Sequence, residues 1–214
     1  MASGEFEIVA RHFRDSGLSF DSSGVDLSIG DDCALLDIAH NKQLAISMDV
    51  LQENVHFPAT AEPGLLGQRA LAVNLSDLAA MGADPFCFTL GLSLPEADDR
   101  WLQAFSRGLL KMARRYSCPL VGGDLIRGNL QIAIQVHGQI GKGDALLRSG
   151  ARPGHLVYVT GTLGDAAAAL ALLSPQDFQN SVGDDKSVFS KTRLSSRQKE
   201  HFIDAFYRPS PGCQ

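Results

Sequence analysis

Four aspartates stand out along this chain because each lies at or beside the end of an apolar stretch, in a segment that contains glycine or other turn residues. They are Asp32 in IGDD, Asp49 in SMD, Asp77 in NLSD and Asp124 in GGD. Rigid scaffolds commonly present ligand-binding side chains at such places. Carboxylates gathered together raise one another's pKa and need cations between them. Hard oxygen ligands without a Cys or His cluster indicate Mg²⁺ rather than zinc.

A magnesium site of this kind predicts a phosphoryl-transfer enzyme, because Mg²⁺ held by a few carboxylates is the usual partner of nucleotide phosphates. The simpler interpretation is that the aspartates belong to turns, since Asp is common in turns that also contain Gly. Spacing alone leaves both interpretations open.

The element that must position Asp77 is a predicted helix over residues 65–81. Its sequence is apolar nearly all round, which is typical of a buried helix. An ionised carboxylate there requires a positive neighbour, because burying an unpaired charge costs several kcal/mol or more. That neighbour is either a basic side chain such as Arg69 or a metal ion.

The other elements follow from hydrophobic spacing and from turn residues. Residues 34–38 and 44–50 predict a hairpin that would bring Asp32 and Asp49 to the same end. The remaining elements are a helix at 5–13, a strand at 86–94, a helix from Asp98 or Asp99 to about Tyr116, and two strands around the turn at 121–129, the second at 131–140. This order predicts an α+β fold.

The character of the sequence changes near Gly150. A strand at 156–160, a glycine turn at 161–165 and a helix at 166–173 begin a new α/β unit. We therefore predict one domain over residues 1–150 and the beginning of an incomplete one over 151–214, because so short a segment is small for a domain. The glycine turn could cradle a phosphate at the helix N-terminus. It matches no phosphate-loop pattern, so we interpret it as a tight turn.

Composition excludes several classes of function. The chain has 214 residues, a formal net charge of -5 and 44% apolar residues, which is typical of a globular protein and argues against a nucleic-acid partner. There is no long uncharged apolar run for a membrane span and no secretory signal pattern, so we expect a cytoplasmic protein. The four scattered cysteines have no zinc or disulfide spacing and are expected to be reduced.

Six motifs in sequence order resemble the thiamine-monophosphate kinase family of the aminoimidazole ribonucleotide synthetase superfamily. The most specific is ALAVNLSDLAAMGADP at residues 70–85. The others are IGDDCALL (29–36), LAISMD (44–49), VGGD (121–124), RSGARPG (148–154) and VYVTGTLGDAAAAL (157–170). The resemblance implies a mixed-sheet N-terminal domain of the synthetase type, followed by a second α/β domain, and a homodimer with the nucleotide site at the subunit interface.

The resemblance also implies roles for residues that match its motifs. It assigns no catalytic residue. The implied Mg²⁺ positions are Asp32, Ser47, Met48 through its backbone, Asp49, Asp77 and Asp124; the implied ATP positions are Gly123, Asp124 and Arg148; the implied substrate position is His56. Without the resemblance, the simpler interpretation of His56 is a packed or surface histidine with no role in binding.

The expected activity is Mg²⁺-dependent transfer of a phosphoryl group from ATP to thiamine monophosphate, directly in line, giving thiamine diphosphate. Family members continue further and carry a DLSDG-type motif that this sequence lacks, so the sequence predicts a C-terminally truncated member. One alternative is an inactive remnant that retains dimerisation and partial metal and nucleotide binding. Another is a superfamily ligase or synthetase with a different substrate.

Overall fold

The computed structural model describes residues 4–159, 161–173 and 194–212. The chain divides into two compact units, one made of Met1–Arg152 with Ser210–Gln214 and the other of Pro153–Pro209. The domain boundary predicted at residue 150 lies close to this division. The roles assigned to the two domains stay predictions.

A four-stranded sheet in the order β3-β6-β4-β5 is the scaffold of the first unit. Strand β3 (Lys42–Gln52) runs antiparallel to β6 (Gln131–Gly141), and β6 runs antiparallel to β4 (Asp84–Leu94). The fourth strand, β5 (Leu120–Arg127), is parallel to β4, which makes the sheet mixed. The predicted α+β fold with a mixed sheet is therefore confirmed.

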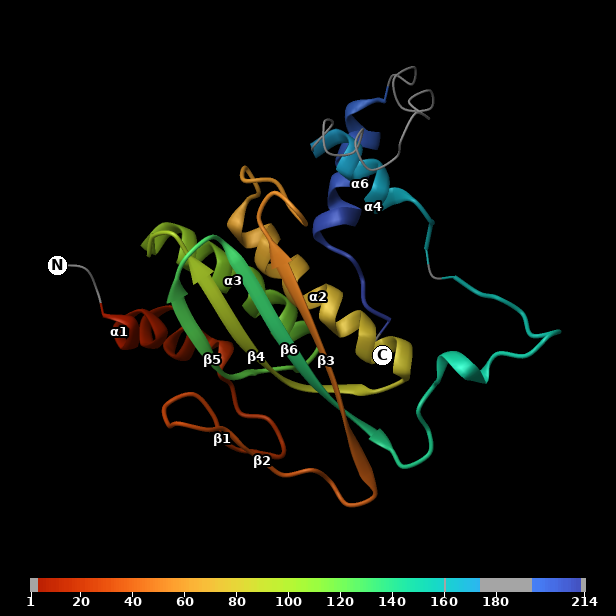
Figure 1. The fold of residues 1–214 in the computed structure, drawn as a ribbon, viewed down its shortest axis with the longest axis horizontal. Helices are drawn as coiled ribbons and strands as arrows, with labels where there is room; N and C mark the ends of the chain where they lie inside the picture. Colours follow the sequence, from red (N-terminus) through yellow and green to blue (C-terminus); the bar gives the residue numbers. More distant parts are fainter. Residues whose placement is uncertain (1–3, 160, 174–193, 213–214) are drawn as a thin grey trace. The chain divides into compact units, whose positions relative to one another are not determined.

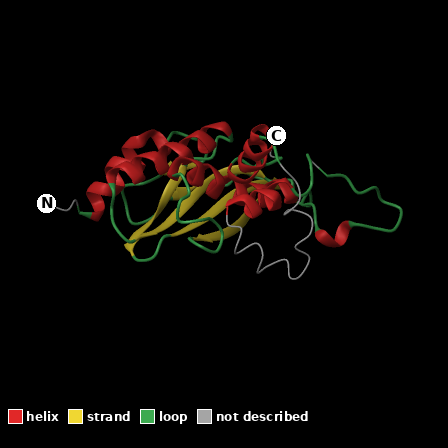
Figure 2. Ribbon diagram, turned by 90° about the horizontal axis from the view of Figure 1, so that it is seen from above, coloured by secondary structure: helices red, strands yellow, loops and turns green. Residues whose placement is uncertain are grey.

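Helices α2 (Pro63–Met81) and α3 (Asp99–Arg115) cover one face of this sheet, as Figure 1 and Figure 2 show. The side chain of Glu62 caps the amides that open α2, and Gly82 closes the helix in the left-handed conformation with φ of 74°. Asp98 caps α3. The helices predicted from residues 65 and 98 are confirmed.

Two glycines let α2 and α3 approach backbone to backbone. A Cβ atom added to Gly108 would lie 2.0 Å from the carbonyl oxygen of Gly64, and one added to Gly67 would lie 2.4 Å from that of Phe105. No side chain fits between the helices at these points. The crossing therefore fixes the distance between α2 and α3 at these points.

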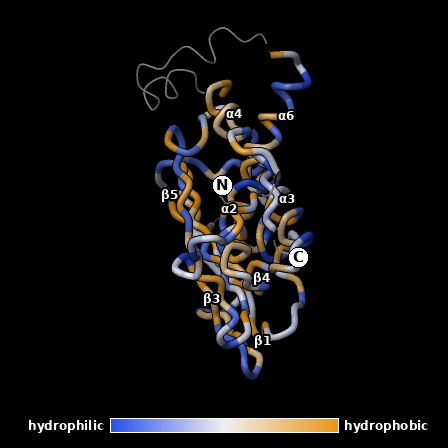
Figure 3. Tube along the Cα trace, turned by 90° about the vertical axis from the view of Figure 1, so that its right-hand side faces the viewer, coloured by the Kyte–Doolittle hydropathy of each residue, from blue (hydrophilic) through white to orange (hydrophobic). Residues whose placement is uncertain are grey.

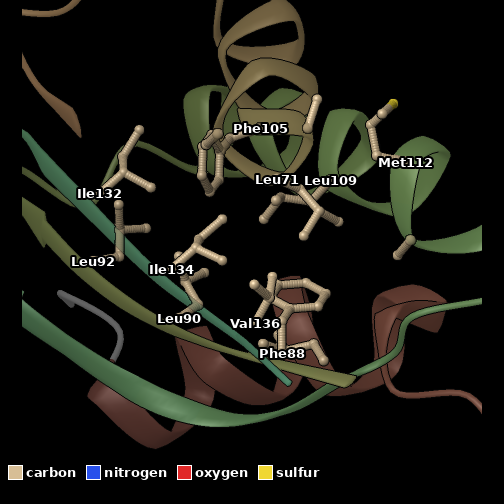
Figure 4. Packing of buried hydrophobic residues seen from close by; sticks show 14 of the residues in the cluster. Leu71, Phe88, Leu90, Leu92, Phe105, Leu109, Met112, Ile132, Ile134 and Val136 are labelled. Atoms are coloured by element: carbon tan, nitrogen blue, oxygen red, sulfur yellow. The ribbon is translucent and has the colours of Figure 1, made fainter. Parts of the chain in front are cut away.

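The main core lies between the sheet and these helices (Figure 4). Leu90 and Leu92 of β4, with Ile134 of β6, point toward Leu71 of α2 and Phe105 of α3, and all five side chains are buried. Each fully buried Leu or Phe stabilises the fold by about 1.5–3 kcal/mol relative to an exposed one. This packing holds the strand and helix that carry Asp49 and Asp77 in fixed positions.

The N-terminal segment adds a helical turn beside α3. Helix α1 (Glu5–Val9) continues into the wider helical segment η1 (Ala10–Leu18), so the predicted helix at 5–13 is longer than expected. The buried His12 lies 2.8 Å, Nε2 to Oδ1, from Asp99, and Arg11 donates to the same carboxylate. This contact fastens η1 to the first turn of α3.

The predicted hairpin of residues 34–38 and 44–50 is wrong. Strand β2 (Leu35–Leu36) pairs instead with β1 (Val25–Leu27) in a separate two-stranded sheet, and β3 pairs with β6. The turn at 40–42 reverses the chain, but the pairing partners come from elsewhere in the sequence. Asp32 and Asp49 consequently do not share a hairpin end.

Two further expectations differ from the structure. The segment 121–127, predicted as a turn, is most of strand β5, and the turn is confined to residues 128–130; the strand at 131–140 is confirmed as β6. The glycines at 122 and 123 look like turn residues, yet both lie in the strand, and Gly123 allows β5 to lie close against β4. Residues 156–159 form no strand, and residue 160 lies outside the described residues.

The face of the sheet opposite α2 and α3 carries an apolar row on β3. Side chains alternate along a strand, so Leu44, Ile46, Met48 and Val50 share this face, and they are 40%, 55%, 54% and 41% exposed. Figure 3 shows apolar stretches, in orange, along the strands of this sheet. Within the described residues β3 is also an edge strand, with β6 as its neighbour.

In the second unit, α4 (Asp165–Leu173) packs with α6 (Ser196–Tyr207). His201 of α6 lies 2.9 Å, Nε2 to Oδ2, from Asp165 at the start of α4, and Ser195 forms a capping box with Gln198. The predicted helix at 166–173 is confirmed. The sequence from residue 174 to 200 is polar and rich in turn residues, which predicts a surface loop with some helix at its end; of this segment, residues 174–193 lie outside the described residues.

Among the described helices, none combines the length and the apolar character that a membrane crossing requires.

Candidate functional site

Strand β3 and helix α2 bring three of the predicted metal-site residues together. Ser47 and Asp49 alternate with the exposed apolar row and face α2, where Asp77 lies one turn from the C-terminal end. The hydroxyl of Ser47 donates a hydrogen bond to Oδ2 of Asp77 over 2.6 Å. The result is a group of hard oxygen donors supplied by two elements of the scaffold, which we name the β3–α2 site: Ser47, Asp49 and Asp77.

The surroundings of Asp77 differ from the expectation that its helix is buried all round. Residues 76, 77 and 80 are exposed, so α2 leaves one strip uncovered near its C-terminal end. Asp77 therefore needs no buried cation for stability. Its carboxylate is held by Ser47 and stays accessible to a ligand.

Asp49 has a raised pKa. Partial burial is the main cause, because it disfavours the charged carboxylate, and the negative charge of Asp77 adds to the effect. The nearby His56 acts in the opposite direction and lowers the pKa. Two coupled carboxylates of this kind are relieved by a bound cation, which favours their ionised forms.

His56 lies just beyond β3, in the turn that follows it, and is exposed. The backbone amide of Gln52 donates a hydrogen bond to its Nδ1 atom over 3.0 Å. An accepting Nδ1 places the proton of the neutral imidazole on Nε2. His56 therefore presents an N–H donor close to the β3–α2 site, a suitable partner for a phosphate oxygen.

The other two predicted aspartates line a pocket of about 450 Å³. Asp32 comes from the loop before β2 and Asp124 from β5, with Gly122 and Gly123 beside it. The Asp124 carboxylate accepts a hydrogen bond from the amide of Leu125 over 3.0 Å. The rest of the wall is largely apolar and includes Val9, Phe13, Ile29, Leu90, Leu92 and Leu120. An apolar pocket with acidic groups suits a ligand that has an aromatic or other apolar group and a polar group bound through a cation.

The four aspartates thus form two groups rather than one. In the part of the chain that the structure describes, no three His, Cys, Asp or Glu side chains gather as a metal-binding set. Arg148 lies in the short helix η2 (Arg148–Gly150), exposed and away from the pocket lining. Met48 directs its side chain to the opposite face, which leaves only its backbone for a site on the α2 side.

The β3–α2 site fits Mg²⁺ that is bound partly by protein and partly by a ligand. Mg²⁺ is rarely enclosed by protein alone and is usually bound by one or two carboxylates, waters and substrate phosphates. Asp49 and Asp77 provide two carboxylates, and burial together with the charge of Asp77 raises the pKa of Asp49, an effect that a bound cation would oppose. The residues therefore fit a cation that shares its coordination with a phosphorylated ligand.

Asn74 is a residue of this site to which the sequence assigned no role. It is 1% exposed, in the middle of α2, and its side chain reaches the backbone of β3 at Asp49. The signal was a polar amide inside an apolar helix, one turn before Asp77.

About half of the chain matches the model of a known protein family. The model described as "AIR synthase related protein, N-terminal domain" matches residues 30–140. That region contains the β3–α2 site, His56 and the whole four-stranded sheet except for the last residue of β6.

Curated and structural relatives agree with this match. The thiamine-monophosphate kinase of Salmonella typhimurium is 52% identical over 215 aligned positions, covering 99% of this chain and 60% of that protein. A crystal structure of thiamine-monophosphate kinase from Stenotrophomonas maltophilia has a TM-score of 0.79 and 39% identity, covering 96% of this chain and 61% of that one. A structure described as "AaThiL complexed with AMPPCP and TMP" has a TM-score of 0.67 and 29% identity, covering 97% and 60%. The chain thus spans about 60% of the length of these relatives.

Proposed function

This chain belongs to the AIR synthase related family, and from that membership we propose that the whole protein is a thiamine-monophosphate kinase. It would transfer the terminal phosphoryl group of ATP to thiamine monophosphate and release ADP and thiamine diphosphate. The observation that carries the proposal is the 52% identity to a curated kinase of this name over nearly the entire chain. The complex of a structural relative with AMPPCP and TMP supports the same pair of ligands.

In this proposal Asp49, Asp77 and Ser47 hold Mg²⁺, with the backbone of Met48 beside them. When bound, Mg²⁺ neutralises phosphate charge and orients the oxygens of the reacting groups. The acidic residues of the pocket, Asp32 and Asp124, would extend the set of oxygen donors. Their proposed role rests on the match of their sequence motifs, since they lie outside the β3–α2 site.

The remaining proposed roles concern binding. Gly123 presents its backbone to the nucleotide without a side chain in the way, and Arg148 offers a guanidinium suited to phosphate oxygens. His56 donates from Nε2 to the phosphate of the acceptor substrate, because its Nδ1 is already occupied by the Gln52 amide. These contacts would bring the two phosphates into line, and positioning supplies most of the catalysis in such reactions.

No general base is required in this scheme. The acceptor is a phosphate monoester, whose oxygen is already anionic near neutral pH and attacks without losing a proton first. The bond between the terminal phosphorus and the bridging oxygen of ATP breaks as the new phosphorus–oxygen bond forms, and the leaving group is ADP. This agrees with the absence of a catalytic residue from the predicted set.

A homodimer is part of the proposal. The exposed apolar row at Leu44, Ile46, Met48 and Val50 lies on the open face of the sheet, where an isolated protomer would leave it in water. Contiguous exposed apolar side chains on a sheet are typical of an interface. Covering this face with a second copy would remove that cost. A cytoplasmic location also remains part of the proposal.

A second candidate function rests on the length comparison. Because the chain spans about 60% of its relatives, the 214 residues by themselves could bind metal and nucleotide without completing phosphoryl transfer. The two candidates share the β3–α2 site and differ in turnover.

The test is ADP release from ATP, Mg²⁺ and thiamine monophosphate, measured on the 214-residue chain and on a version extended with the C-terminal part of a relative. Activity in either form, dependent on thiamine monophosphate, supports the kinase proposal. Activity only in the extended form assigns binding without turnover to the shorter chain. A panel of other phosphate acceptors is the control, and preference for one of them would overturn the proposed substrate.

A further inference from the structure

The buried side chain of Asn74 connects α2 to β3. Its Oδ1 atom accepts a hydrogen bond from the backbone amide of Asp49 over 2.9 Å, and its Nδ2 donates to the carbonyl oxygen of Ala70 over 2.9 Å. Only 1% of the residue is exposed. A buried amide whose oxygen and nitrogen both form hydrogen bonds is held in a single orientation, because breaking either bond leaves a buried polar group without a partner.

The bond reaches β3 at a place where the sheet offers no partner. In the described residues β3 is an edge strand with β6 on one side, so alternate backbone amides point away from the sheet. The amide of Asp49 is satisfied by a side chain of α2 instead. The backbone of Asp49 is thereby tied to the helix that carries Asp77.

A second bond joins the same two elements. Ser47, two residues before Asp49, donates to Asp77, three residues after Asn74. The two bonds cross from strand to helix next to each other and fix both the register and the separation of the two carboxylates. The Ser47 bond uses one of the oxygens that a cation would need, whereas the Asn74 bond uses only backbone and leaves the Asp49 carboxylate free.

We propose that Asn74 is a positioning residue that holds Asp49 against Asp77 for cation binding. This inference rests on the proposed function, because that function assigns Mg²⁺ to the two carboxylates. Asn74 itself touches neither metal nor substrate. It acts through the Asp49 backbone, in the way that hydrogen-bonding partners behind metal ligands orient those ligands.

The chain offers a matched control in the same helix. Ser76 donates to the carbonyl oxygen of Ala72 over 2.9 Å, which is the same kind of bond to the preceding turn that Asn74 makes to Ala70. Ser76 is exposed and has no bond to β3. Ser76→Ala therefore removes the local bond alone, and Asn74→Leu removes both the local bond and the link to Asp49.

Two measurements on the 214-residue chain test the proposal. Hydrogen exchange of the Asp49 amide, followed by NMR, should become at least about tenfold faster in Asn74→Leu, since the acceptor is lost. Calorimetric titration with Mg²⁺ in the presence of AMPPCP should show an affinity for Mg²⁺ about 10–100-fold weaker, the usual effect of removing a partner behind a metal ligand. Ser76→Ala should change neither value. Asn74→Ser, whose side chain is too short to reach β3 but remains polar, should behave as Asn74→Leu and replaces it if the leucine variant fails to fold.

The outcomes distinguish the positioning role of Asn74 from the proposed Mg²⁺ site. Folded Asn74 variants that bind Mg²⁺ as tightly as the wild type, with the Asp49 amide exchanging faster, would overturn the positioning role and leave the proposed kinase function intact. A wild-type chain that binds no Mg²⁺ in the presence of AMPPCP would contradict the proposed metal site itself, before any substitution is considered. Weaker binding in Ser76→Ala as well would show a general effect of the helix and would also overturn the role of Asn74.

Discussion

The hydroxyl of Ser47 and the carboxylate of Asp77 are joined by a hydrogen bond of 2.6 Å between an edge strand and a helix. The two residues are thirty positions apart in the sequence, yet the bond sets the shape of the β3–α2 site. It holds one carboxylate oxygen of Asp77 and leaves the other available. The site is therefore partly organised before any cation binds, which lowers the cost of binding one.

Asp77→Asn tests the metal role of this carboxylate. The substitution keeps the shape and an oxygen for Ser47 but removes the negative charge, so Mg²⁺-dependent nucleotide binding should weaken by about tenfold or more. Because Asp77 is exposed, the free energy of unfolding should change by no more than about 1 kcal/mol. Calorimetric titration with AMPPCP and Mg²⁺ measures the affinity, and thermal unfolding measures the stability. Unchanged binding with a large loss of stability would favour a purely structural role.

Gly123 and Gly122 form a natural pair for testing the β4–β5 contact. Gly123 has φ of 153°, and a Cβ atom there would lie 1.9 Å from the carbonyl oxygen of Leu90, whereas Gly122 has nothing within 4 Å. Gly123→Ala should destabilise the protein by about 2–4 kcal/mol, through overpacking and backbone strain. Gly122→Ala should cost less than about 1 kcal/mol. Urea unfolding gives the free energy of unfolding of both variants, and equal losses of stability would contradict the close contact of Gly123 with Leu90.

The His12–Asp99 contact predicts how stability depends on pH. The pKa of Asp99 is lowered, first by the hydrogen bond with His12 and further by Arg11. A lowered pKa in the folded state stabilises the protein above the unfolded value of about 3.9, and this contribution is lost as the pH falls through the lowered folded value. Asp99→Asn should therefore melt at a lower temperature than the wild type at pH 7.

The difference between the two melting curves should shrink as the pH falls below about 4, where the wild type also loses its carboxylate charge. Glu96→Gln, at an exposed acid outside this contact, is the control. A difference that stays constant from pH 7 to pH 2 would mean that the substitution acts through packing rather than through the ionised pair.

Thiol labelling probes the pocket that contains Asp32 and Asp124. Cys33 is exposed and lies in the pocket lining, whereas burial raises the pKa of Cys87 to about 12. At pH 8 iodoacetamide should modify Cys33 in the folded protein and leave Cys87 unmodified, because the thiolate is the reactive form. Peptide mass spectrometry gives the extent at each site, and both should react in denaturant. ATP with Mg²⁺ should slow the labelling of Cys33; no protection would argue against a nucleotide in this pocket.

The apolar row on β3 predicts the oligomeric state. Ile46 is 55% exposed on the open face, and Ile46→Asp would place a charge in the proposed dimer interface. Size-exclusion chromatography with light scattering should show a dimer for the wild type and a monomer for Ile46→Asp. Ile46→Val keeps the face apolar and should remain dimeric. A monomeric wild type at micromolar concentration would overturn the dimer proposal.

Local patterns in the sequence predicted most of the elements of the first unit. Residues 65–81 form a long apolar run that ends at Gly82, and residues 131–140 alternate apolar and polar side chains, so the sequence predicts the helix and the strand nearly at their true limits. These features depend on neighbours in the chain. They are therefore visible without the tertiary structure.

The errors in the first unit mostly concern relationships between distant segments. The partner of β3 is β6, and β2 pairs with β1, so the expected hairpin was replaced by pairings that no local pattern encodes. The glycines at 122 and 123 suggest a turn, because the close approach of Gly123 to Leu90 is a tertiary contact that the local sequence does not reveal. The predicted aspartates fall into two groups for the same reason, and the exposure of Asp77 depends on which strip of α2 the rest of the fold leaves uncovered.

The pairing of β3 with β6 has a consequence for synthesis of the protein on the ribosome. Residue 42 of β3 pairs with residue 141, and residue 52 pairs with residue 131. Helix α2 and its crossing with α3 can assemble from sequence that emerges earlier, whereas β3 waits for its partner strand to leave the exit tunnel. During that interval its apolar residues and its unpaired edge are both exposed to other nascent chains. The strand that carries Ser47 and Asp49 is thus the part of the site that is completed last, when β6 arrives.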